Sequence, residues 1–326
     1  MSKNLWIAPA PHVKDKASTG SIMLCVTAAL LPTLFASTYI FGFRALLLTL
    51  VCVASCVIFE YLYRVLTKQS NTILDFSAVV TGLLLAYNLP STFPIWMAMI
   101  GCFVAIVVVK QLFGGIGQNF ANPAIAARVV LLVSFSKDMA NFVIPTFKDG
   151  VITRVVGATP LASINAQMPT LADHSELMFG GVEGVPDIFM MLFGIRGGSL
   201  GETCAITLLI GGIYLICKKI ISPIIPLTYI GTVFVLSWLL GVNPVQQVLA
   251  GGLILGAFFM ATDYTTSPVT KKGKYIYAVG CGLLTVLIRL FGNYVEGVSF
   301  AILLMNIVTP LIDRYTKTRP FGGIAK

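Results

Sequence analysis

The sequence predicts an all-α polytopic membrane protein with about ten transmembrane helices. Of its 326 residues, 57% are hydrophobic and only 11% are charged, and the mean hydropathy is +0.90. Soluble globular domains are much more polar. Apolar runs such as residues 95–109 also leave no polar face to meet water, which disfavours a soluble protein with a large core. A chain of this length has room for roughly eight to eleven spans of about 20 residues.

The apolar blocks define the expected spans and divide the chain into five parts. We expect spans at residues 20–41, 45–66, 76–89, 93–109, 120–135, 200–217, 224–240, 245–261, 275–291 and 298–312. The parts are an N-terminal segment (1–19), a first half of five helices (20–136), a long polar loop (137–199), a second half of five helices (200–312) and a C-terminal tail (313–326). The first nineteen residues are polar, so we expect no cleavable signal peptide.

The basic residues predict the orientation of these spans. Fifteen of the 22 Lys and Arg residues fall on the side of the two chain ends, and six fall on the opposite side. Because cytoplasmic loops carry the excess of positive charge, both termini are expected in the cytoplasm and the loop 137–199 outside it. The formal net charge is +9, but the basic residues are scattered between apolar blocks and form no stripe, so we expect no nucleic acid partner.

Five spans before the long loop and five after it enter the membrane from opposite sides, which is the topology of an inverted repeat. A weak internal similarity supports this interpretation: GLLLAYNLPSTFP at residues 82–94 ends the third span, and GAFFMATDYTTSP at residues 256–268 ends the eighth. Both spans are short. We therefore expect some helices to be broken inside the membrane, with free ends that line a polar site.

Charged residues in or beside the spans are functional candidates, since each costs about 2.5–3.5 kcal/mol at a helix centre on insertion scales. Glu60 is a candidate for an ion path, and its alternative role is an i,i+4 partner of Arg64. Asp263 ends the eighth span and is the second ion-path candidate. Glu202 is expected at the positive N-terminal end of the sixth span. Arg128 either neutralises a phosphate or extends to the cytoplasmic surface, and its position favours the second.

The sequence favours neither a metal site nor a disulfide. The seven cysteines lie in or beside apolar spans without a C-x-x-C pair, which is typical of small buried hydrophobic residues. The two histidines are far apart in the sequence. We also identify no catalytic residue.

The polar loop contains the run VVGATPLAS at residues 155–163. Gly157 and Ala158 present Thr159 after two residues with almost no side chain, and Pro160 fixes the backbone that follows. This arrangement suits a hydroxyl that a modifying enzyme must reach. The same tripeptide is also compatible with an ordinary turn.

Five motifs, in this order along the chain, give the sequence a family resemblance: PHVKDKAS (11–18), GGIGQNFANPA (114–124), VVGATPLAS (155–163), GGSLGETCA (197–205) and MATDYTTSP (260–268). With them the chain resembles the family that includes the D subunit of the Rnf complex, the membrane-bound ferredoxin:NAD oxidoreductase. It is more distantly similar to the B subunit of the sodium-pumping NADH:quinone reductase.

The resemblance implies two flavins. FMN would be attached to Thr159 through a phosphodiester, with Gly157 and Ala158 in the attachment motif. The family pattern has Asp six residues before this threonine and Ser or Thr three before it, whereas this chain has Thr153 and Val156 there. Riboflavin would be held without a covalent bond.

No riboflavin ligand can be assigned from the resemblance. The turn with Gly117, Asn119 and Asn122 is compatible with a cofactor-lining role and equally with a tight helix-entry turn.

The function implied by the resemblance is that of a non-catalytic membrane component of an ion-translocating oxidoreductase in the prokaryotic cytoplasmic membrane. It would relay electrons through flavins while sodium ions or protons are translocated. The A, B, C, E and G subunits of the Rnf complex would be its partners, and ferredoxin and NAD would act on those partners, since no dinucleotide-binding motif follows a strand here. The alternatives are a solute transporter or channel with an inverted repeat and no redox cofactor, and a purely structural anchor.

Overall fold

The structure is a computed structural model that describes residues 18–148, 151–157, 188–194, 196–202, 204–292 and 296–317. Helices make up most of these residues, and many apolar side chains on their outer surfaces are exposed, as a lipid-facing surface requires. Phe35, Tyr39 and Phe43, for example, are more than two-thirds exposed. The structure confirms the expected all-α polytopic membrane fold.

The first half begins where Ser18 and Ser21 form a reciprocal capping box at the start of the first helix. Gly42 separates the first two helices with a φ of 80°, a conformation that favours glycine. The elements of this half are α1 (Thr19–Phe41), α2 (Phe43–Leu66), η1 (Ile73–Asp75), α3 (Ser77–Tyr87), α4 (Ile95–Phe103), η2 (Val104–Gln111), α5 (Pro123–Ser134) and α6 (Ser136–Met139).

The short helix α9 (Ile188–Phe193) belongs to the long loop. The second half contains α10 (Ala205–Cys217), α11 (Ile224–Leu239), α12 (Pro244–Leu249), α13 (Leu253–Leu255), η4 (Gly256–Met260), α14 (Lys271–Phe291) and α15 (Val298–Tyr315). Two helices, α5 and α12, start in the same way: an asparagine accepts hydrogen bonds from the first free N–H groups, and a proline occupies the first turn. The segments η2 and η4 are π-helical and continue α4 and α13.

Four helices of the described chain are long and apolar enough to cross a membrane by themselves: α1, α2, α14 and α15. The predicted third span is a helix of only 11 residues, α3. The predicted eighth span is not continuous, because the chain leaves helical geometry at residues 250–252 between α12 and α13. The expectation that one span is broken is therefore confirmed for the eighth.

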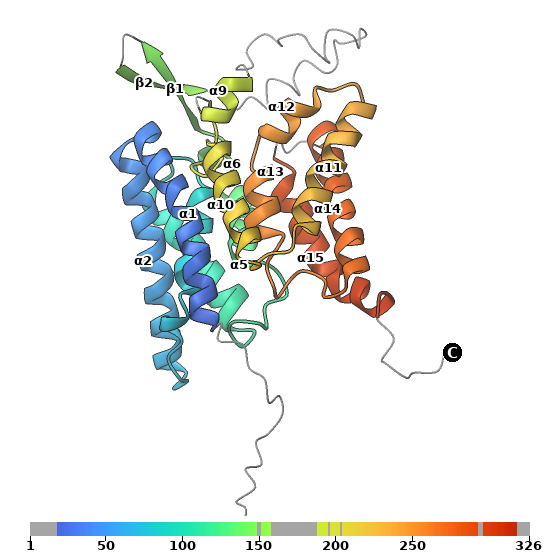
Figure 1. Ribbon diagram of the computed structural model, residues 1–326. Helices are drawn as coiled ribbons and strands as arrows, with labels where there is room; N and C mark the ends of the chain where they lie inside the picture. The colour runs from blue at the N-terminus through green and yellow to red at the C-terminus, as the bar shows by residue number, and fades with distance from the viewer. Residues whose placement is uncertain are drawn as a thin grey trace, which may run out of the picture.

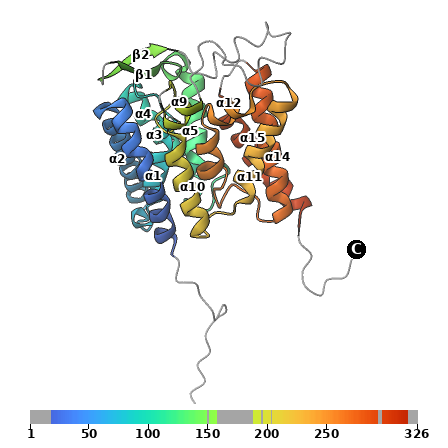
Figure 2. The same ribbon diagram turned by 45° about the horizontal axis from the view of Figure 1, so that its top comes forward.

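The two halves lie side by side, with α1–α5 in one group and α11, α14 and α15 in the other (Figures 1 and 2). Helix α10 of the second half packs against α1 of the first, and α5 packs against α15. Glycines allow this close approach: a Cβ on Gly211 of α10 would lie 2.3 Å from the carbonyl oxygen of Ala29 in α1. Small residues at such contacts are typical of membrane helices.

The described parts of the long loop contain a two-stranded antiparallel hairpin, β1 (Phe142–Lys148) and β2 (Val151–Gly157). We did not expect strands here. The sequence does carry a signal for them, since Asp149-Gly150 separates two runs rich in β-branched and aromatic residues. The hairpin lies on the face opposite to the start of α1 and the end of α15, which share one face (Figure 1).

Candidate functional site

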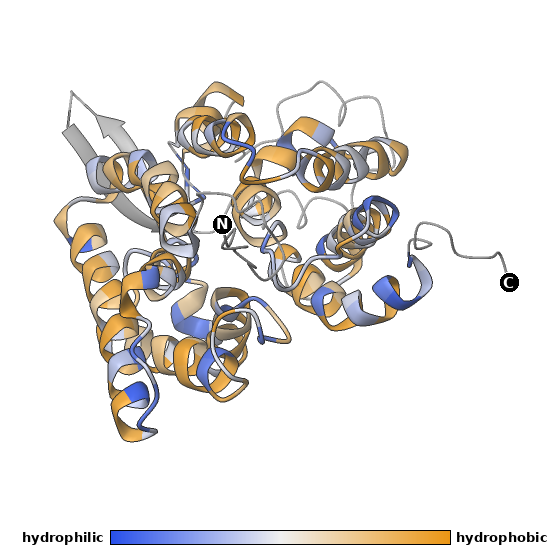
Figure 3. Cartoon of the chain, turned by 60° about the horizontal axis from the view of Figure 1, so that its bottom comes forward, coloured by the Kyte–Doolittle hydropathy of each residue, from blue (hydrophilic) through white to orange (hydrophobic). Residues whose placement is uncertain are grey.

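A cavity of about 310 Å³ lies between the two halves, near the face where α1 begins. Its walls are mostly apolar, and its polar groups come from Thr19, Ser77, Thr81 and Lys110 and from the turns at residues 116–122 and 262–265. Both π-helical segments contribute: η2 provides Lys110, and η4 provides Phe258 and Phe259. Short π-helical stretches occur frequently at functional sites. Figure 3 shows the molecule from the side of this face, with hydrophobic residues dominating the helices.

Asn119 and Asn122 both line this cavity, together with Gly117. The Asn122 side chain caps α5 by accepting from the N–H groups of Ala124 and Ile125, and it donates to the carbonyl oxygen of Met260 at 3.3 Å. Asn119 donates to Thr265 Oγ1 at 3.4 Å, and its buried Oδ1 has no partner. Asn119 therefore has an acceptor available for a bound molecule.

Asp263 lies in the same cavity wall, at the turn that follows η4. Its carboxylate accepts hydrogen bonds from the hydroxyls of Thr265 at 3.2 Å and Thr266 at 3.5 Å, which fix the turn. Burial raises the pKa of the Asp263 carboxyl above its ordinary value, while these hydrogen bonds act in the opposite direction. From behind, Thr309 of α15 donates to the carbonyl oxygen of Thr266.

Glu60 forms its ion pair with a residue that the sequence did not suggest. Its Oε2 lies 2.7 Å from Lys110 Nζ, and its Oε1 accepts from the hydroxyl of Thr72 at 2.8 Å. Arg64, the expected i,i+4 partner, instead donates to Gln69 at 2.9 Å. The alternative that Glu60 pairs with Arg64 was therefore wrong. The two residues are four apart on one helix, but the cation that Glu60 contacts is the buried ammonium group of Lys110 in η2.

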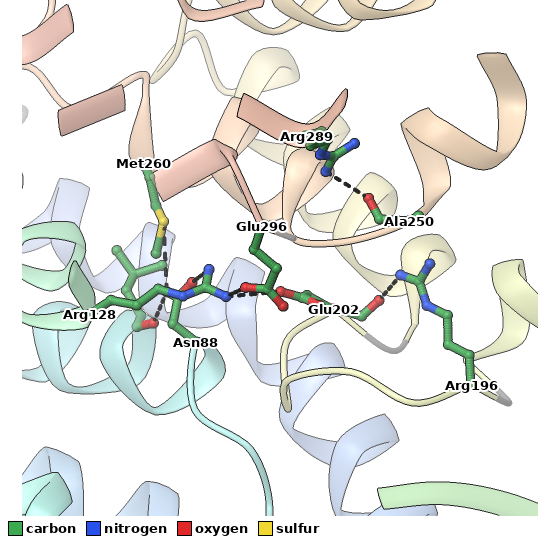
Figure 4. Close-up of polar contacts among 9 residues, drawn as sticks. Asn88, Arg128, Arg196, Glu202, Ala250, Met260, Arg289 and Glu296 are labelled. Atoms are coloured by element: carbon green, nitrogen blue, oxygen red, sulfur yellow. Dashed lines mark hydrogen bonds and ion pairs between the residues drawn. The ribbon is translucent and has the colours of Figure 1, made fainter. Parts of the chain in front are cut away.

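Arg128 of α5 is the centre of a buried charged cluster between the halves (Figure 4). Its guanidinium donates to Asn88 Oδ1 at 2.6 Å and pairs with Glu202 at 3.3 Å and with Glu296. Arg128 is 2% exposed, so the expectation that it extends to the surface was wrong. Two carboxylates from the second half hold it inside.

Glu202 also lies elsewhere than predicted. Helix α10 starts three residues later, at Ala205, and the Glu202 carboxylate points to Arg128 rather than serving the first turn of that helix. Gly198 and Gly252 leave room for it, since a Cβ on either would come within 3.2 Å of a carboxylate oxygen of Glu202. The motif GGSLGET thus places a carboxylate between the two halves.

The segment 197–202 also provides hydrogen-bond donors to the end of α3, which lies inside the bundle. The carbonyl oxygens at the end of α3 accept hydrogen bonds from backbone N–H groups of the segment, Tyr87 from Gly201 at 2.8 Å and Leu89 from Leu200 at 3.0 Å. Such carbonyls have no partner within their own helix and no water in the hydrocarbon region.

The end of α12 is capped by arginines. Arg289 donates to the carbonyl oxygen of Gln247 at 2.6 Å, and Arg196 donates to that of Leu249. Arg289 also donates to the carbonyl oxygen of Ala250 at 3.0 Å, and Arg196 to that of Glu202 (Figure 4). A cation at a helix C-terminus also interacts favourably with the negative end of the helix dipole. The break in the eighth span therefore has a physical explanation.

The structure describes only part of the motif that we predict to carry a flavin. Gly157 is the last residue of β2 and pairs with Phe142, whereas Ala158 and Thr159 lie outside the described residues. Thr153 and Val156, where the chain departs from the family pattern, are strand residues of β2. Among the described residues, no group of His, Cys, Asp and Glu side chains is arranged to hold a metal ion.

Comparison with known proteins shows the family of this chain. A model of the NQR2, RnfD, RnfE family matches residues 6–322. The D subunit of the Na⁺-translocating ferredoxin:NAD⁺ oxidoreductase complex of Acetobacterium woodii is 48% identical over 98% of this chain and 96% of its own. The proton-translocating counterpart from Clostridium ljungdahlii is 42% identical over 99% and 98%. The D subunit of the ion-translocating oxidoreductase complex of Stutzerimonas stutzeri is 38% identical over 95% and 94%. The chain therefore belongs to the NQR2, RnfD, RnfE family.

Proposed function

We propose that this protein is the D-type membrane component of an ion-translocating ferredoxin:NAD⁺ oxidoreductase complex. The observation that carries the proposal is identity of 48% and 42% to two such proteins, and of 38% to the D subunit of an ion-translocating oxidoreductase complex, over nearly the full length of each chain. The protein is not catalytic alone. Its partners would be the A, B, C, E and G subunits, and ferredoxin and NAD⁺ would react at those partners. It would lie in the cytoplasmic membrane with both termini in the cytoplasm, as the Lys and Arg count indicates.

The cavity fits a non-covalently held flavin, which we propose to be riboflavin. Its volume of about 310 Å³ lies in the range of small-molecule sites, and its apolar walls with a few polar groups suit a flat aromatic ring. The unpartnered Oδ1 of Asn119 is an acceptor for a ring N–H, and the hydroxyls of Thr81 and Thr262 supply further polar contacts. A bound flavin supplies one- and two-electron redox chemistry. The chain's own residues hold it, orient it and exclude water.

We propose a second flavin, FMN, joined to Thr159 on the extracytoplasmic side. The support is the intact Gly157-Ala158-Thr159 sequence and the position of β2, whose end lies on the face opposite to the start of α1 (Figure 1). A phosphodiester tether would leave the redox-active ring unmodified. The peptide that contains Thr159 would then exceed the mass of its amino acids by that of one FMN less one water.

Glu60 and Asp263 remain the proposed ion-path residues. Asp263 lines the cavity, and Glu60 contacts the cavity-lining Lys110. Two similar proteins are named for different ions, sodium and protons, so the family membership leaves both open for this chain. Ion uptake measured in membrane vesicles with and without sodium would distinguish them.

One experiment separates this proposal from a transporter or channel that lacks a redox cofactor. The wild-type protein, produced with the flavin transferase and precipitated with acid, should retain flavin fluorescence, and Thr159→Ala should lose it. The supernatant should contain riboflavin from both proteins. A colourless wild-type pellet and supernatant would refute the electron-carrier function. If Thr159→Ala removed the fluorescence of the pellet, no riboflavin appeared in the supernatant and the activity of the complex were unchanged, the protein would be an anchor.

A further inference from the structure

Lys110 lies between the cavity and a buried carboxylate. Its Nζ is 2.7 Å from Glu60 Oε2 and 2.7 Å from Ser77 Oγ. Lys110 and Ser77 line the cavity, whereas Glu60 does not. Both charged residues are almost fully buried, with exposed fractions of 2% for Lys110 and 1% for Glu60. The ammonium group thus separates the carboxylate from whatever occupies the cavity.

Glu60 has a second contact, away from Lys110. Its Oε1 accepts a hydrogen bond from Thr72, which is partly exposed, and the preceding residue, Asn71, is exposed. Among the described residues, Lys110 is the cation within ion-pair distance of this carboxylate. If Lys110 moved away, Glu60 and the Thr72 hydroxyl would present oxygen atoms to a cation that entered from the surface at Asn71.

A charge in the cavity acts strongly on Lys110. In a buried site the interaction of two charges is screened much less than in water, so a new negative charge in the cavity competes with Glu60 for the ammonium group. The lysine side chain has a flexible four-carbon stem and a compact charge, which allow it to change partner. Its position in the π-helical segment η2 brings it to the cavity wall.

We propose that Lys110 couples the charge of the cavity's occupant to cation binding at Glu60. This rests on the proposed flavin in the cavity. A one-electron carrier of the complex would lose one electron to the flavin in the cavity. The cavity would then hold one more negative charge. Lys110 turns from Glu60 towards this charge, and Glu60 takes up one sodium ion or proton from the surface. Departure of the electron returns Lys110 to Glu60 and releases the cation, so one cation is bound and released per electron.

The test is a potentiometric titration of the non-covalent flavin in the purified complex at several sodium concentrations and pH values. Coupling of one cation to one electron predicts that the midpoint potential of the wild type rises by about 59 mV per tenfold increase in the coupling cation. Lys110→Met and Glu60→Gln should each abolish this dependence. Lys110→Arg, which retains the positive charge, should keep part of it. Lys218→Met, which changes an exposed lysine on the same face, is the matched control and should behave as the wild type.

A wild-type slope in either Lys110→Met or Glu60→Gln would overturn the coupling role of Lys110. Flavin content is measured for every variant. Glu60→Gln leaves the cavity lining intact and therefore tests the proposal even if Lys110→Met loses its flavin. A wild-type slope near zero for both cations would also refute the coupling, whereas absence of flavin from the wild type would refute the proposed function instead.

Discussion

Arg128→Met should strongly destabilise the protein. The variant removes the guanidinium from between Glu202 and Glu296 and deletes the 2.6 Å hydrogen bond to Asn88. Removing one partner of a buried ion pair costs about 3–5 kcal/mol, because a charge is left buried without compensation. At about 2–4 °C per kcal/mol this predicts a melting temperature lower by roughly 6–20 °C.

The buried free cysteines provide the assay, since a thiol-reactive fluorophore labels Cys52, Cys102 and Cys281 only when the helices separate on heating. The control is the triple variant Arg128→Met/Glu202→Gln/Glu296→Gln, in which the carboxylates are neutralised as well. Replacing a complete buried charge cluster is far less costly than breaking it, so this variant should recover most of the loss. A single variant that melts within about 1 °C of the wild type, or a triple variant no better than the single one, would contradict the assigned role of Arg128.

Three further predictions follow from individual contacts. Gly211→Ala should lower the melting temperature clearly, because its Cβ would lie 2.3 Å from the carbonyl oxygen of Ala29. The control is Gly231→Ala, whose Cβ would have no atom within 4 Å and which should not lower the melting temperature. Equal effects of the two variants in a melting assay would argue against the close α1–α10 contact. Asp263→Asn should stabilise the protein above the raised pKa of Asp263, where burial penalises the wild-type carboxylate, and the difference should shrink as the pH falls; a difference independent of pH would count against this. Arg289→Met should lower the free energy of unfolding by about 1–3 kcal/mol, because buried carbonyl oxygens lose their partner. Limited proteolysis measures this in the α12–α13 region, and unchanged protease resistance there would disprove the role of Arg289.

The sequence predicted the fold class well because it depends on composition and on apolar runs, which are local properties. It also indicated the broken eighth span, since that span is short and ends in a sequence similar to the end of the third. The partners of the buried charges could not be predicted in this way. Glu60 has a cation four residues later on its own helix, and only the three-dimensional structure shows that Lys110, fifty residues away, takes that place.

The same reason explains the errors at Arg128 and Glu202. Position along a span suggested the surface for one and a helix end for the other, yet each is the other's partner across the two halves. Asn119, Asn122 and Asp263 were chosen separately from a turn and a span end, and the fold brings all three to one cavity. Thr159 remains a prediction from its motif.

The arginine-capped end of α12 has a consequence for biogenesis. This helix has six residues, and its last carbonyl groups obtain a partner from Arg289, near the end of α14. During synthesis the ribosome delivers α12 well before that arginine. Before α14 is made, Arg196, which precedes α12 in the chain, can serve the carbonyl oxygen of Leu249, whereas those of Gln247 and Ala250 obtain their arginine partner only when α14 is in place.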